Sequence, residues 1–465
     1  MVAAPELYPE WHSARVTQTH GYAAFALALI VASGFALTVL VFYPGYITVD
    51  ARYVYAEARA WHFGDWQSPA MGLLWRLIDP LAPGALSMFL LTATLYWLSF
   101  GLLAFIALRR SPWLGLLTPL LAFAPPAFVF TGMIWRDIQF AVIWLLAAVL
   151  AFAAAEFAAR FRLGLQPLAL GLVAYGVLLR PNAVIAAPLL AAYAVSPTRF
   201  TLKRTALLYL PAAVIFAALV PLVYYGLLGA QRQNPLHSIL VFDLGGITHF
   251  SAENQFPVQW SAEETALLKT TCYDPARWDT FWHMPPCPFV MHRLERPDDL
   301  IFGTLRVTHA WWDALITHPF AYLEHRATFM WQFLARSNLV LPVWDWSAAD
   351  SSYGHSPYFR PVLKLHDALE HSLLFRPGIW LLACVAIGAL AWPLRETPSG
   401  AFAVAVTSCG AVYVMSFFVL GVAADFRYAY WCVLATLAAA PAVALARYER
   451  GAGSPGGAQE LRPSA

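Results

Sequence analysis

Residues 43–69, YPGYITVDARYVYAEARAWHFGDWQSP, follow directly on the first long apolar segment of the chain. The triplet Tyr43-Pro44-Gly45 predicts the end of that segment's helix, because proline lacks a backbone donor and glycine tolerates any turn. Asp50 then lies only a few residues beyond the membrane boundary, at the depth of the lipid head groups. The stretch therefore predicts a polar segment that lies at one face of a membrane.

If a short helix begins near Asp50, the charged side chains of this stretch lie on two of its faces. Asp50, Tyr53 and Glu57 fall at positions i, i+3 and i+7 and share one face. Arg52 and Arg59 share another face. A surface-lying helix with acids on one side and cations on another is suited to work on lipid phosphates. The alternative is that Asp50 is only the N-cap of the helix, a position that Asp favours.

The composition is that of an integral membrane protein. Of 465 residues, 60% are hydrophobic and 12% are charged, whereas soluble proteins have about 25% charged residues. A net charge of +2, without a basic cluster that includes aromatic residues, argues against nucleic acid as a partner. The first apolar run is too long for a cleaved signal segment, so it predicts an uncleaved anchor. The expected surroundings are a lipid bilayer.

Ten apolar segments are candidates for membrane-spanning helices, because about 20 apolar residues cross a hydrocarbon layer of about 30 Å. If the N-terminus is cytoplasmic, the connections rich in Arg and Lys also fall on the cytoplasmic side, as the positive-inside rule requires. The sixth segment is short, and it is retained because its omission would place Arg199, Lys203 and Arg204 outside. The ten segments are 21–42, 84–108, 113–131, 138–157, 163–179, 183–195, 206–228, 374–394, 401–422 and 429–446.

The expected fold is an all-α polytopic membrane protein in four parts. Residues 1–228 form an N-terminal transmembrane module whose first outer loop, 43–83, contains the polar stretch. Residues 229–373 form a long, partly helical extracytoplasmic segment, and residues 374–447 form the last transmembrane helices. Residues 448–465, rich in Gly, Pro and Ser, are expected to be a disordered cytoplasmic tail.

Two features interrupt the apolar segments of the N-terminal module. Pro125-Pro126 predicts a kink or break in the third segment, because neither residue can donate a helical hydrogen bond. Residues 71–84, MGLLWRLIDPLAPG, are apolar but too short and too broken to span a membrane. We expect this piece to be interfacial or re-entrant.

Four short polar elements are expected to meet at the outer face. Charges so close to membrane spans cost a few kcal/mol each when they face lipid, so a shared cavity is favoured. The alternative is local: Arg136 with Asp137, or Asp425 with Arg427, could be ion pairs that only fix loop geometry. The four elements are residues 50–65, 134–137, 179–182 and 425–428.

The cysteines divide into two groups. Cys272 and Cys287 lie in the long polar segment and form a disulfide if that segment faces an oxidising compartment, or remain two unlinked thiols otherwise. Cys384, Cys409 and Cys432 lie in apolar runs and are expected to be small packing residues. The histidines show no tight ligand spacing such as HExxH, so no metal site is indicated. Most tryptophans of the polar segment are expected to be membrane-interface anchors.

These motifs together resemble the multi-spanning glycosyltransferases of the GT-C superfamily, which share an acidic residue in the outer loop after the first helix. The resemblance covers the architecture from residue 21 to the long loop at residue 229. Similar bacterial sequences tend to have a histidine where Gln67 stands, so no metal or proton role is assigned to Gln67. The motifs are YPGYITVD (43–50), DWQSP (65–69), IWRD (134–137), LRPN (179–182) and DFRYAY (425–430).

The resemblance implies transfer of a sugar from a polyprenyl-phosphate carrier to a hydroxyl of a glycan, lipid or protein. The implied setting is the extracytoplasmic face of a bacterial inner membrane, with both termini in the cytoplasm. Asp50 is then the catalytic base. The implied ligands of the donor phosphate are Arg136, Arg180 and Arg427, whose planar groups stabilise a leaving phosphate by paired hydrogen bonds.

The same resemblance leaves three roles open for Asp137, the second catalytic candidate. Asp137 could orient Arg136, bind the acceptor, or help to hold a divalent cation, Mg²⁺ or Mn²⁺, that bridges carboxylate and phosphate. The residues expected to contact substrate are Tyr53, Glu57, Asp65, Trp66, Asn182 and Asp425.

A transporter or flippase of lipid-linked saccharides is the alternative class. About ten helices, helix-breaking prolines and a polar cavity are also typical of transporters. A transporter, however, should show inverted repeats and ionisable residues near the midplane, whereas the charges here cluster at one face. A third class, a scaffold or receptor, leaves the acids of the short loops unexplained.

Overall fold

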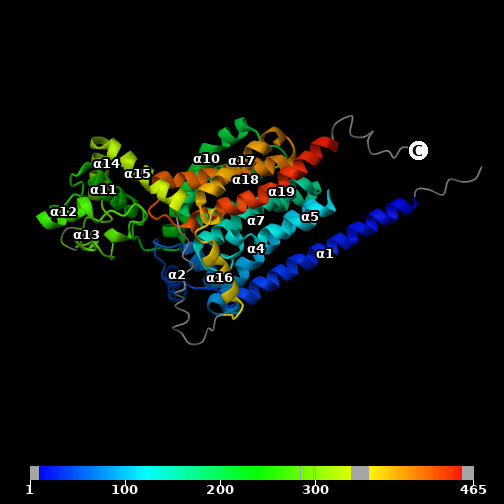
Figure 1. Ribbon diagram of the computed structural model, residues 1–465, viewed down its shortest axis with the longest axis horizontal. Helices are drawn as coiled ribbons and strands as arrows, with labels where there is room; N and C mark the ends of the chain where they lie inside the picture. The colour runs from blue at the N-terminus through cyan, green and yellow to red at the C-terminus, as the bar shows by residue number, and fades with distance from the viewer. Residues whose placement is uncertain (1–9, 283, 297, 299, 337–355, 453–465) are drawn as a thin grey trace, which may run out of the picture.

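The computed structural model shows a bundle of α-helices with a helical subdomain at one end (Figure 1). It describes residues 10–282, 284–296, 298, 300–336 and 356–452. Over these residues the backbone forms helices and three isolated β-bridges but no β-strand. The predicted all-α class is confirmed.

Eight helices within the described ranges are long and apolar enough to cross a membrane. Each has an apolar stretch of at least 18 residues, close to the length that crosses the hydrocarbon core. The chain is therefore a polytopic membrane protein. The spans are Gly21–Phe42 in α1 (Glu10–Phe42), Ala85–Leu108 (α4), Arg136–Glu156 (α7), Ala159–Leu179 (α8), Leu202–Leu227 (α10, Leu202–Pro221, with η4, Leu222–Leu227), Pro377–Leu394 (α17, Pro377–Ala391, with η9, Trp392–Leu394), Pro398–Leu420 (α18) and Phe426–Arg450 (η10, Phe426–Ala429, with α19, Tyr430–Ala452).

The other two expected spans consist of shorter pieces. In the third, the backbone leaves helical geometry at Ala124, so the break predicted at Pro125-Pro126 is confirmed. The sixth is only nine residues of α-helix after a short 3₁₀ turn. Neither reaches the length of about 20 residues that a span needs, and the count of ten spans stays a prediction. The pieces are α5 (Pro112–Leu117), η2 (Thr118–Phe123), α6 (Pro125–Phe128), η3 (Pro181–Ile185) and α9 (Ala187–Val195).

Helices α7 and α19 form the centre of the bundle. In the most apolar 18-residue stretch of α7, 94% of the residues are buried. In the corresponding stretch of the span Leu202–Leu227, which includes α10, only 6% are buried. Helix α7 packs against α4, α8 and α19, and α17, α18 and α19 all pack against one another. Many of the buried residues of α7 and α19 are alanines, which let helices approach closely in a membrane. The exposed apolar face of α10 is suited to contact with lipid.

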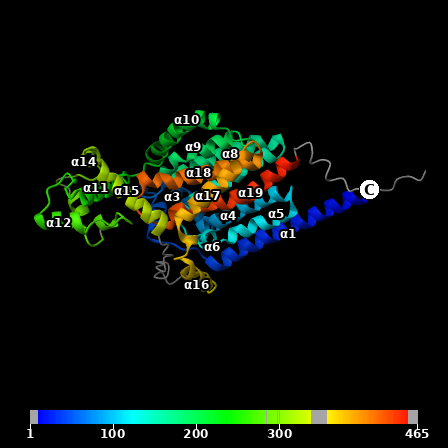
Figure 2. The same ribbon diagram turned by 45° about the horizontal axis from the view of Figure 1, so that its top comes forward.

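The two ends of the bundle differ in character. One end contains the Arg-rich connections, where Arg110 pairs with Glu156 at 2.8 Å and the Phe200 N–H donates to the Arg395 carbonyl at 2.8 Å. The first residues of α1 and the last of α19 lie at that end in both views (Figures 1 and 2). Helix α2 (Val49–Ala60) and the subdomain lie at the opposite end (Figure 1).

The chain turns sharply where α1 ends. Helix α1 stops at Phe42, as predicted, and Gly45 adopts a φ of +100° against the ring of Phe89, which a larger residue could not do without strain. After α2, the N-cap Ser68 begins α3 (Pro69–Ile78), and η1 (Asp79–Leu81) ends this segment. Helix α3 packs against α8 and α4 and is too short to span, as expected for residues 71–84.

The subdomain follows α10 and returns to the bundle through α15. The disulfide predicted between Cys272 and Cys287 is confirmed. The thiols of Cys384, Cys409 and Cys432 are buried in the bundle, as expected of packing residues. The subdomain elements are α11 (His237–Ser251), α12 (Ala262–Thr270), η5 (Asp279–Phe281), α13 (Phe289–Leu294), α14 (Leu305–Thr317), α15 (Pro319–Trp331) and η6 (Gln332–Arg336).

Helix α16 (Phe359–Leu369) and η8 (Leu373–Phe375) connect the subdomain side of the chain to α17. The ring of Phe359 packs against Phe42 and Tyr46, so α16 lies beside the end of α1. Most of the predicted tail, residues 453–465, lies outside the described residues, and α19 continues to Ala452.

A buried ionic network fastens the subdomain to the bundle. Asp243 of α11 forms an ion pair with Arg326, whose Nη2 lies 2.6 Å from Asp243 Oδ1. Asp243 also accepts a hydrogen bond from Trp311 Nε1 at 2.7 Å and lies 3.1 Å from His325 Nε2. Arg326 Nη1 also donates to the carbonyl of Gly421 at 2.7 Å, just after α18. Because these charges are removed from water, their mutual contacts must compensate for the lost hydration.

We expect the subdomain to lose stability in mildly acidic solution. Burial lowers the pKa of His325, although Asp243 opposes the shift. An unfolded histidine takes up a proton at about pH 6.5, so a folded state that resists protonation becomes less stable as the pH falls below that value. Burial raises the pKa of Asp243, but Arg326 and His325 lower it further, so Asp243 loses its contribution only below about pH 4.

The measurement is hydrogen exchange of the amides of α11 and α15, corrected for the intrinsic pH dependence of exchange. Protection should fall between about pH 6.5 and pH 5. His325→Gln should remove most of this dependence, because glutamine does not titrate. A native chain whose protection stays constant over this range would contradict the prediction.

Candidate functional site

Asp50 lies in the first turn of α2, at the subdomain end of the bundle. The N-cap is Thr48, so the reading of Asp50 as the N-cap is wrong, and Thr48 Oγ1 accepts from Trp135 Nε1 at 2.8 Å. Asp50 receives hydrogen bonds from two other parts of the chain, Gln67 Nε2 and Arg427 Nη1, both at 3.2 Å. The Asp50 side chain is 47% exposed. Its carboxylate is therefore held in place and still accessible.

Arg427 bridges two carboxylates. Its Nη1 lies 3.2 Å from Asp50 Oδ2, and its Nε lies 3.0 Å from Asp425 Oδ2. The guanidinium carbon lies 4.8 Å from the ring centroid of Trp135 and 5.2 Å from that of Tyr428. Aromatic faces of this kind stabilise a cation. The local pair of Asp425 with Arg427 is thus formed, and the same guanidinium also reaches Asp50.

A second ion pair also contacts Tyr428. Arg180, directly after α8, pairs with Asp137 in the first turn of α7 at 3.0 Å, and both side chains are nearly fully buried. The Arg180 guanidinium carbon lies 5.0 Å from the Tyr428 ring centroid, so this ring contacts both Arg180 and Arg427. Asp137 therefore pairs with the arginine that follows the next long helix rather than with its neighbour Arg136.

Arg136 is the third arginine of the cluster. Its Nη1 donates to the carbonyl of Trp66 at 3.0 Å. The Arg136 charge is close enough to Asp50, Asp137 and Arg180 to interact with all three. The structure thus brings together residues from the four polar elements that the sequence analysis expected to meet at one face.

A backbone connection places part of the subdomain over this cluster. An isolated antiparallel bridge pairs Arg277 with Ala423, two residues before Asp425. The Trp278 N–H donates to the Val422 carbonyl at 2.9 Å. The subdomain is therefore attached to the turn that positions Arg427.

Three tryptophans and a fourth carboxylate accompany this connection. The ring centroids of Trp278 and Trp282 lie 5.9 Å and 4.4 Å from that of Trp66. Asp279 stands between the two subdomain tryptophans in sequence and interacts electrostatically with Arg427 and Asp50. Burial raises the pKa of Asp279, although nearby arginines oppose the shift. Its position adjoins the Asp50 site.

Two predicted substrate-binding residues hold loops in the structure. Glu57 Oε1 accepts from the Gly64 N–H at 3.0 Å, and burial raises the Glu57 pKa against the effect of this hydrogen bond. Both carboxylate oxygens of Asp65 are engaged, by the Tyr225 hydroxyl at 2.8 Å and the Gln233 N–H at 2.6 Å. These contacts tie the loop after α2 to the segment after α10.

The remaining predicted residues differ in position. Tyr53 projects from α2 with 64% of its surface exposed. Asn182 is half-buried in η3 and lies beside Tyr413, which in turn lies beside Arg180. Trp66 and Asp425 belong to the cluster through the contacts described above. Substrate contact by any of these residues remains a prediction.

Several residues of the cluster were not expected from the sequence. Gln67 was assigned no role, yet it donates to Asp50, and Trp135 and Tyr428 form the aromatic surroundings of Arg427. The segment WDTFW, residues 278–282, had one usable signal: it lies between Cys272 and Cys287 in a loop that the disulfide closes. Nothing in its spacing indicated that it folds back toward α2.

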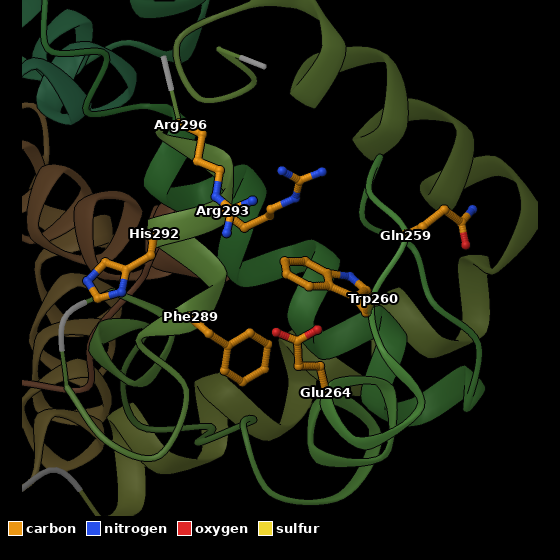
Figure 3. A pocket seen from close by; sticks show the side chains of 7 residues that line it. All are labelled: Gln259, Trp260, Glu264, Phe289, His292, Arg293 and Arg296. Atoms are coloured by element: carbon orange, nitrogen blue, oxygen red, sulfur yellow. The ribbon is translucent and has the colours of Figure 1, made fainter. Parts of the chain in front are cut away.

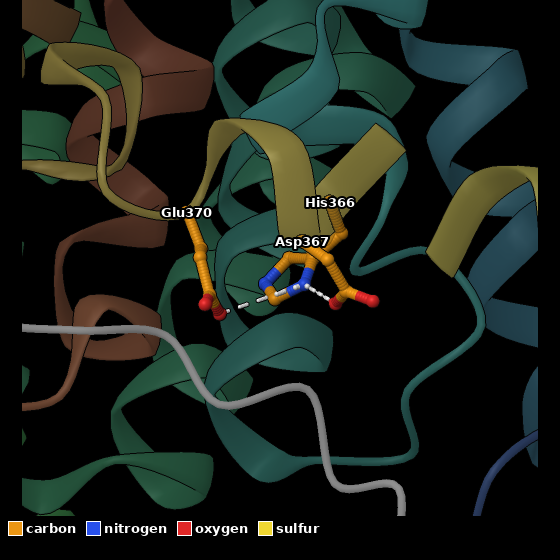
Figure 4. A group of neighbouring side chains, drawn as sticks. All are labelled: His366, Asp367 and Glu370. Carbon is orange, nitrogen blue, oxygen red and sulfur yellow. Dashed lines mark hydrogen bonds and ion pairs between the residues drawn. The ribbon is translucent and has the colours of Figure 1, made fainter. Parts of the chain in front are cut away.

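A separate group of polar residues lies at the end of α16, whose C-cap is Glu370. His366 Nδ1 lies 3.1 Å from Asp367 Oδ1 and 4.0 Å from Glu370 Oε2 (Figure 4). The potential ligand atoms lie within 4.8 Å of one another, a spacing that a metal ion could occupy. A histidine that pairs with two carboxylates would make the same contacts without a metal ion. This group lies outside the Asp50 cluster.

The fold and the site define an all-α, multi-spanning membrane protein with a cluster of carboxylates and guanidiniums at one end of its bundle. Comparisons of the chain with protein-family models, with curated proteins and with solved structures found no match.

Proposed function

We propose that this membrane protein is a glycosyltransferase that moves a sugar from a polyprenyl-phosphate carrier to a hydroxyl of a glycan, lipid or protein. The observation that carries this proposal is the contact of half-exposed Asp50 with Arg427, beside Arg136 and Arg180. By the positive-inside rule we assign the Arg-rich end to the cytoplasm. The Asp50 cluster is then extracytoplasmic, in a bacterial inner membrane.

The chemistry requires a base and an anion site close together. The acceptor oxygen forms a bond to the sugar C1, and the bond between C1 and the phosphate oxygen breaks. The electron pair of that bond leaves with polyprenyl phosphate, and the hydroxyl proton passes to a base. Asp50 suits the role of base because its carboxylate is fixed by Gln67 and Arg427 and is open on one side.

Arg427 suits the role of the main phosphate ligand. Its side chain is 19% exposed, against 9% for Arg180. A donor phosphate that binds Arg427 competes with Asp50 for the guanidinium and thereby frees Asp50 Oδ2 for the acceptor proton. Arg136, near the same charges, would add a second cation beside the phosphate.

Asp137 fits a positioning role better than contact with substrate. It is nearly fully buried and pairs with Arg180, so it holds that guanidinium beside the Tyr428 ring. We therefore propose that Asp137 orients Arg180 and not Arg136. Loss of Asp137 would leave a buried arginine without its partner, which is strongly unfavourable.

The charges at this end are compatible with a divalent cation. Four carboxylates, those of Asp50, Asp137, Asp279 and Asp425, accompany three guanidiniums, those of Arg136, Arg180 and Arg427. A donor phosphate would add further negative charge. Carboxylate oxygens are the ligands that Mg²⁺ and Mn²⁺ prefer, and the accessible Asp50 would supply one of them. Such an ion would neutralise charge on the leaving phosphate.

The direct test is transfer from radiolabelled polyprenyl-phosphate hexoses and pentoses by the purified full chain in lipid vesicles. Transfer to extracted cell-envelope glycan or lipid acceptors, or to water, is the expected result. A chain that neither transfers label nor binds any of these donors would overturn the proposal.

We expect Arg427→Ala to weaken donor binding at least about tenfold, because a charged hydrogen bond to phosphate is lost. The measurement is the dissociation constant of a radiolabelled polyprenyl-phosphate sugar. Arg59→Ala is the matched control, since Arg59 forms a more exposed ion pair with Asp79 on the same side of the molecule. Unchanged donor affinity in Arg427→Ala would remove this residue from the phosphate site.

A flippase of lipid-linked saccharides remains the second candidate, because α5, η2 and α6 form a broken segment of the kind that transporters contain. The Asp, Glu, Lys and Arg residues of the eight spans lie at or near the ends, which disfavours an ion-coupled carrier. The fate of a labelled donor in lipid vesicles distinguishes a flippase from a transferase. A flippase moves the intact donor across the bilayer, whereas a transferase cleaves it.

A further inference from the structure

The subdomain contains a cavity that the proposed reaction does not use. It has a volume of about 370 Å³ and lies between α12 and α13. Its aromatic wall consists of Trp260 and Phe289, whose ring centroids lie 5.6 Å apart and whose planes are nearly perpendicular. Figure 3 shows these rings and the side chains of Glu264 and Arg293 gathered around one space.

The walls of this cavity are fixed by local structure. A capping box begins α12: Ser261 Oγ accepts from the Glu264 N–H at 3.1 Å, and Glu264 Oε2 accepts from the Ser261 N–H at 2.9 Å. Trp260 Nε1 donates to Asn254 Oδ1 at 3.1 Å. The Cys272–Cys287 disulfide joins the end of α12 to the start of α13. A binding surface with walls held in this way requires little ordering when a ligand enters.

More basic than acidic side chains line the cavity. Arg293 and Arg296 line it, together with the single carboxylate of Glu264. One oxygen of that carboxylate is already engaged in the capping box. Guanidinium groups bind carboxylates and phosphates through paired hydrogen bonds, and aromatic rings offer a flat apolar surface that suits a sugar ring.

We propose that this cavity binds an acidic saccharide unit, a pyranose ring that carries a carboxylate or a phosphate. The volume lies within the range of about 300–1,000 Å³ that is usual for ligand cavities. One part of the inference rests on the proposed function: the acidic unit belongs to the acceptor glycan, which the subdomain holds while another hydroxyl of the glycan reacts near Asp50. Binding itself does not depend on that reaction.

The experiment is isothermal titration calorimetry of the full chain in detergent micelles with four probes. They are α-1,4-digalacturonate, its neutral counterpart α-1,4-galactobiose, galactose 6-phosphate and inorganic phosphate. We expect digalacturonate, galactose 6-phosphate or both to bind at least about tenfold more tightly than galactobiose. Which of the two anionic sugars binds more tightly identifies carboxylate or phosphate as the recognised group.

Substitutions locate the binding on the protein. Arg293→Ala with Arg296→Ala should weaken binding of the anionic sugar at least about tenfold. Trp260→Leu should weaken binding of the sugars but not of inorganic phosphate. Arg360→Ala removes an exposed arginine from α16, outside the cavity, and should leave binding unchanged. Thermal unfolding curves that match the native chain show that each variant is folded.

Three results would overturn the proposal. They are the failure of both anionic sugars to bind more tightly than galactobiose, binding of inorganic phosphate as tight as that of the tighter anionic sugar, and anionic-sugar binding that survives the double arginine substitution. Failure of sugar transfer with binding intact would overturn the proposed function and leave this site standing. Sugar transfer without any binding of anionic sugars in this cavity would overturn the proposed site and leave the proposed function standing.

Discussion

Asp50→Asn is expected to lower the rate of sugar transfer at least about 100-fold, because a positioned general base contributes roughly 10²–10⁴ to a rate. Asparagine has the same shape as aspartate and can still accept from Arg427 Nη1, at the position where Asp50 Oδ2 now lies 3.2 Å away. It cannot take up the acceptor proton. The measurement is turnover of a radiolabelled polyprenyl-phosphate sugar at saturating donor.

Donor affinity separates the loss of a base from the loss of a binding site. The Asp50 carboxylate competes with donor phosphate for Arg427, so Asp50→Asn should bind donor as tightly as the native chain or more tightly. Glu396→Gln is the control, since Glu396 is an exposed carboxylate beside Arg395, at the opposite end of the bundle. Its turnover should remain within about twofold of the native value. Retained turnover in Asp50→Asn would exclude this residue as the base.

Arg326→Leu is expected to destabilise the attachment of the subdomain by about 3–5 kcal/mol, because it leaves Asp243 buried without its cation. The substitution removes the 2.6 Å contact with Asp243 and the hydrogen bond to the Gly421 carbonyl. Hydrogen exchange in α11 and α15 should accelerate by about 100-fold or more, since each 1.4 kcal/mol corresponds to a factor of ten.

An exposed ion pair supplies the comparison for Arg326. Arg277 pairs with Asp274 at 3.0 Å, with side chains 52% and 33% exposed. Arg277→Leu should change local stability by about 1 kcal/mol or less, as is usual for surface pairs. If both substitutions accelerated hydrogen exchange equally, burial of the Asp243–Arg326 pair would not explain its contribution to stability. Arg326→Leu should also reduce transfer, because Gly421 lies just before the turn that positions Arg427.

The features that the sequence predicted well are those that neighbouring residues decide. Tyr43-Pro44-Gly45 ends α1 because proline and glycine limit the local backbone, whatever the rest of the chain does. Pro125-Pro126 interrupts the third apolar segment for the same reason. The two cysteines of the polar segment are 15 residues apart and form the predicted disulfide. Capping was predicted less well: Asp50 was one candidate for the N-cap of α2, and Thr48 occupies that position.

The site was predictable only in outline. Charged elements close to spans avoid lipid, and that preference indicated that four of them share one face. The preference does not specify partners, and Asp137 pairs with Arg180 although Arg136 is its neighbour in sequence. Asp279 and the tryptophans around it were not expected at the site at all. Their position depends on a backbone bridge between Arg277 and Ala423, which no local pattern encodes.

By itself, the sequence determined that this protein is an all-α membrane protein, where its first helix ends, and where its third apolar segment breaks. Hydropathy and helix-breaking residues act over a few neighbouring positions, so these properties can be read locally. Only the tertiary structure decided that Arg427 contacts Asp50, 377 residues away in the chain. The position of that guanidinium depends on how α2, α7 and η10 pack together, and packing is a property of the whole bundle.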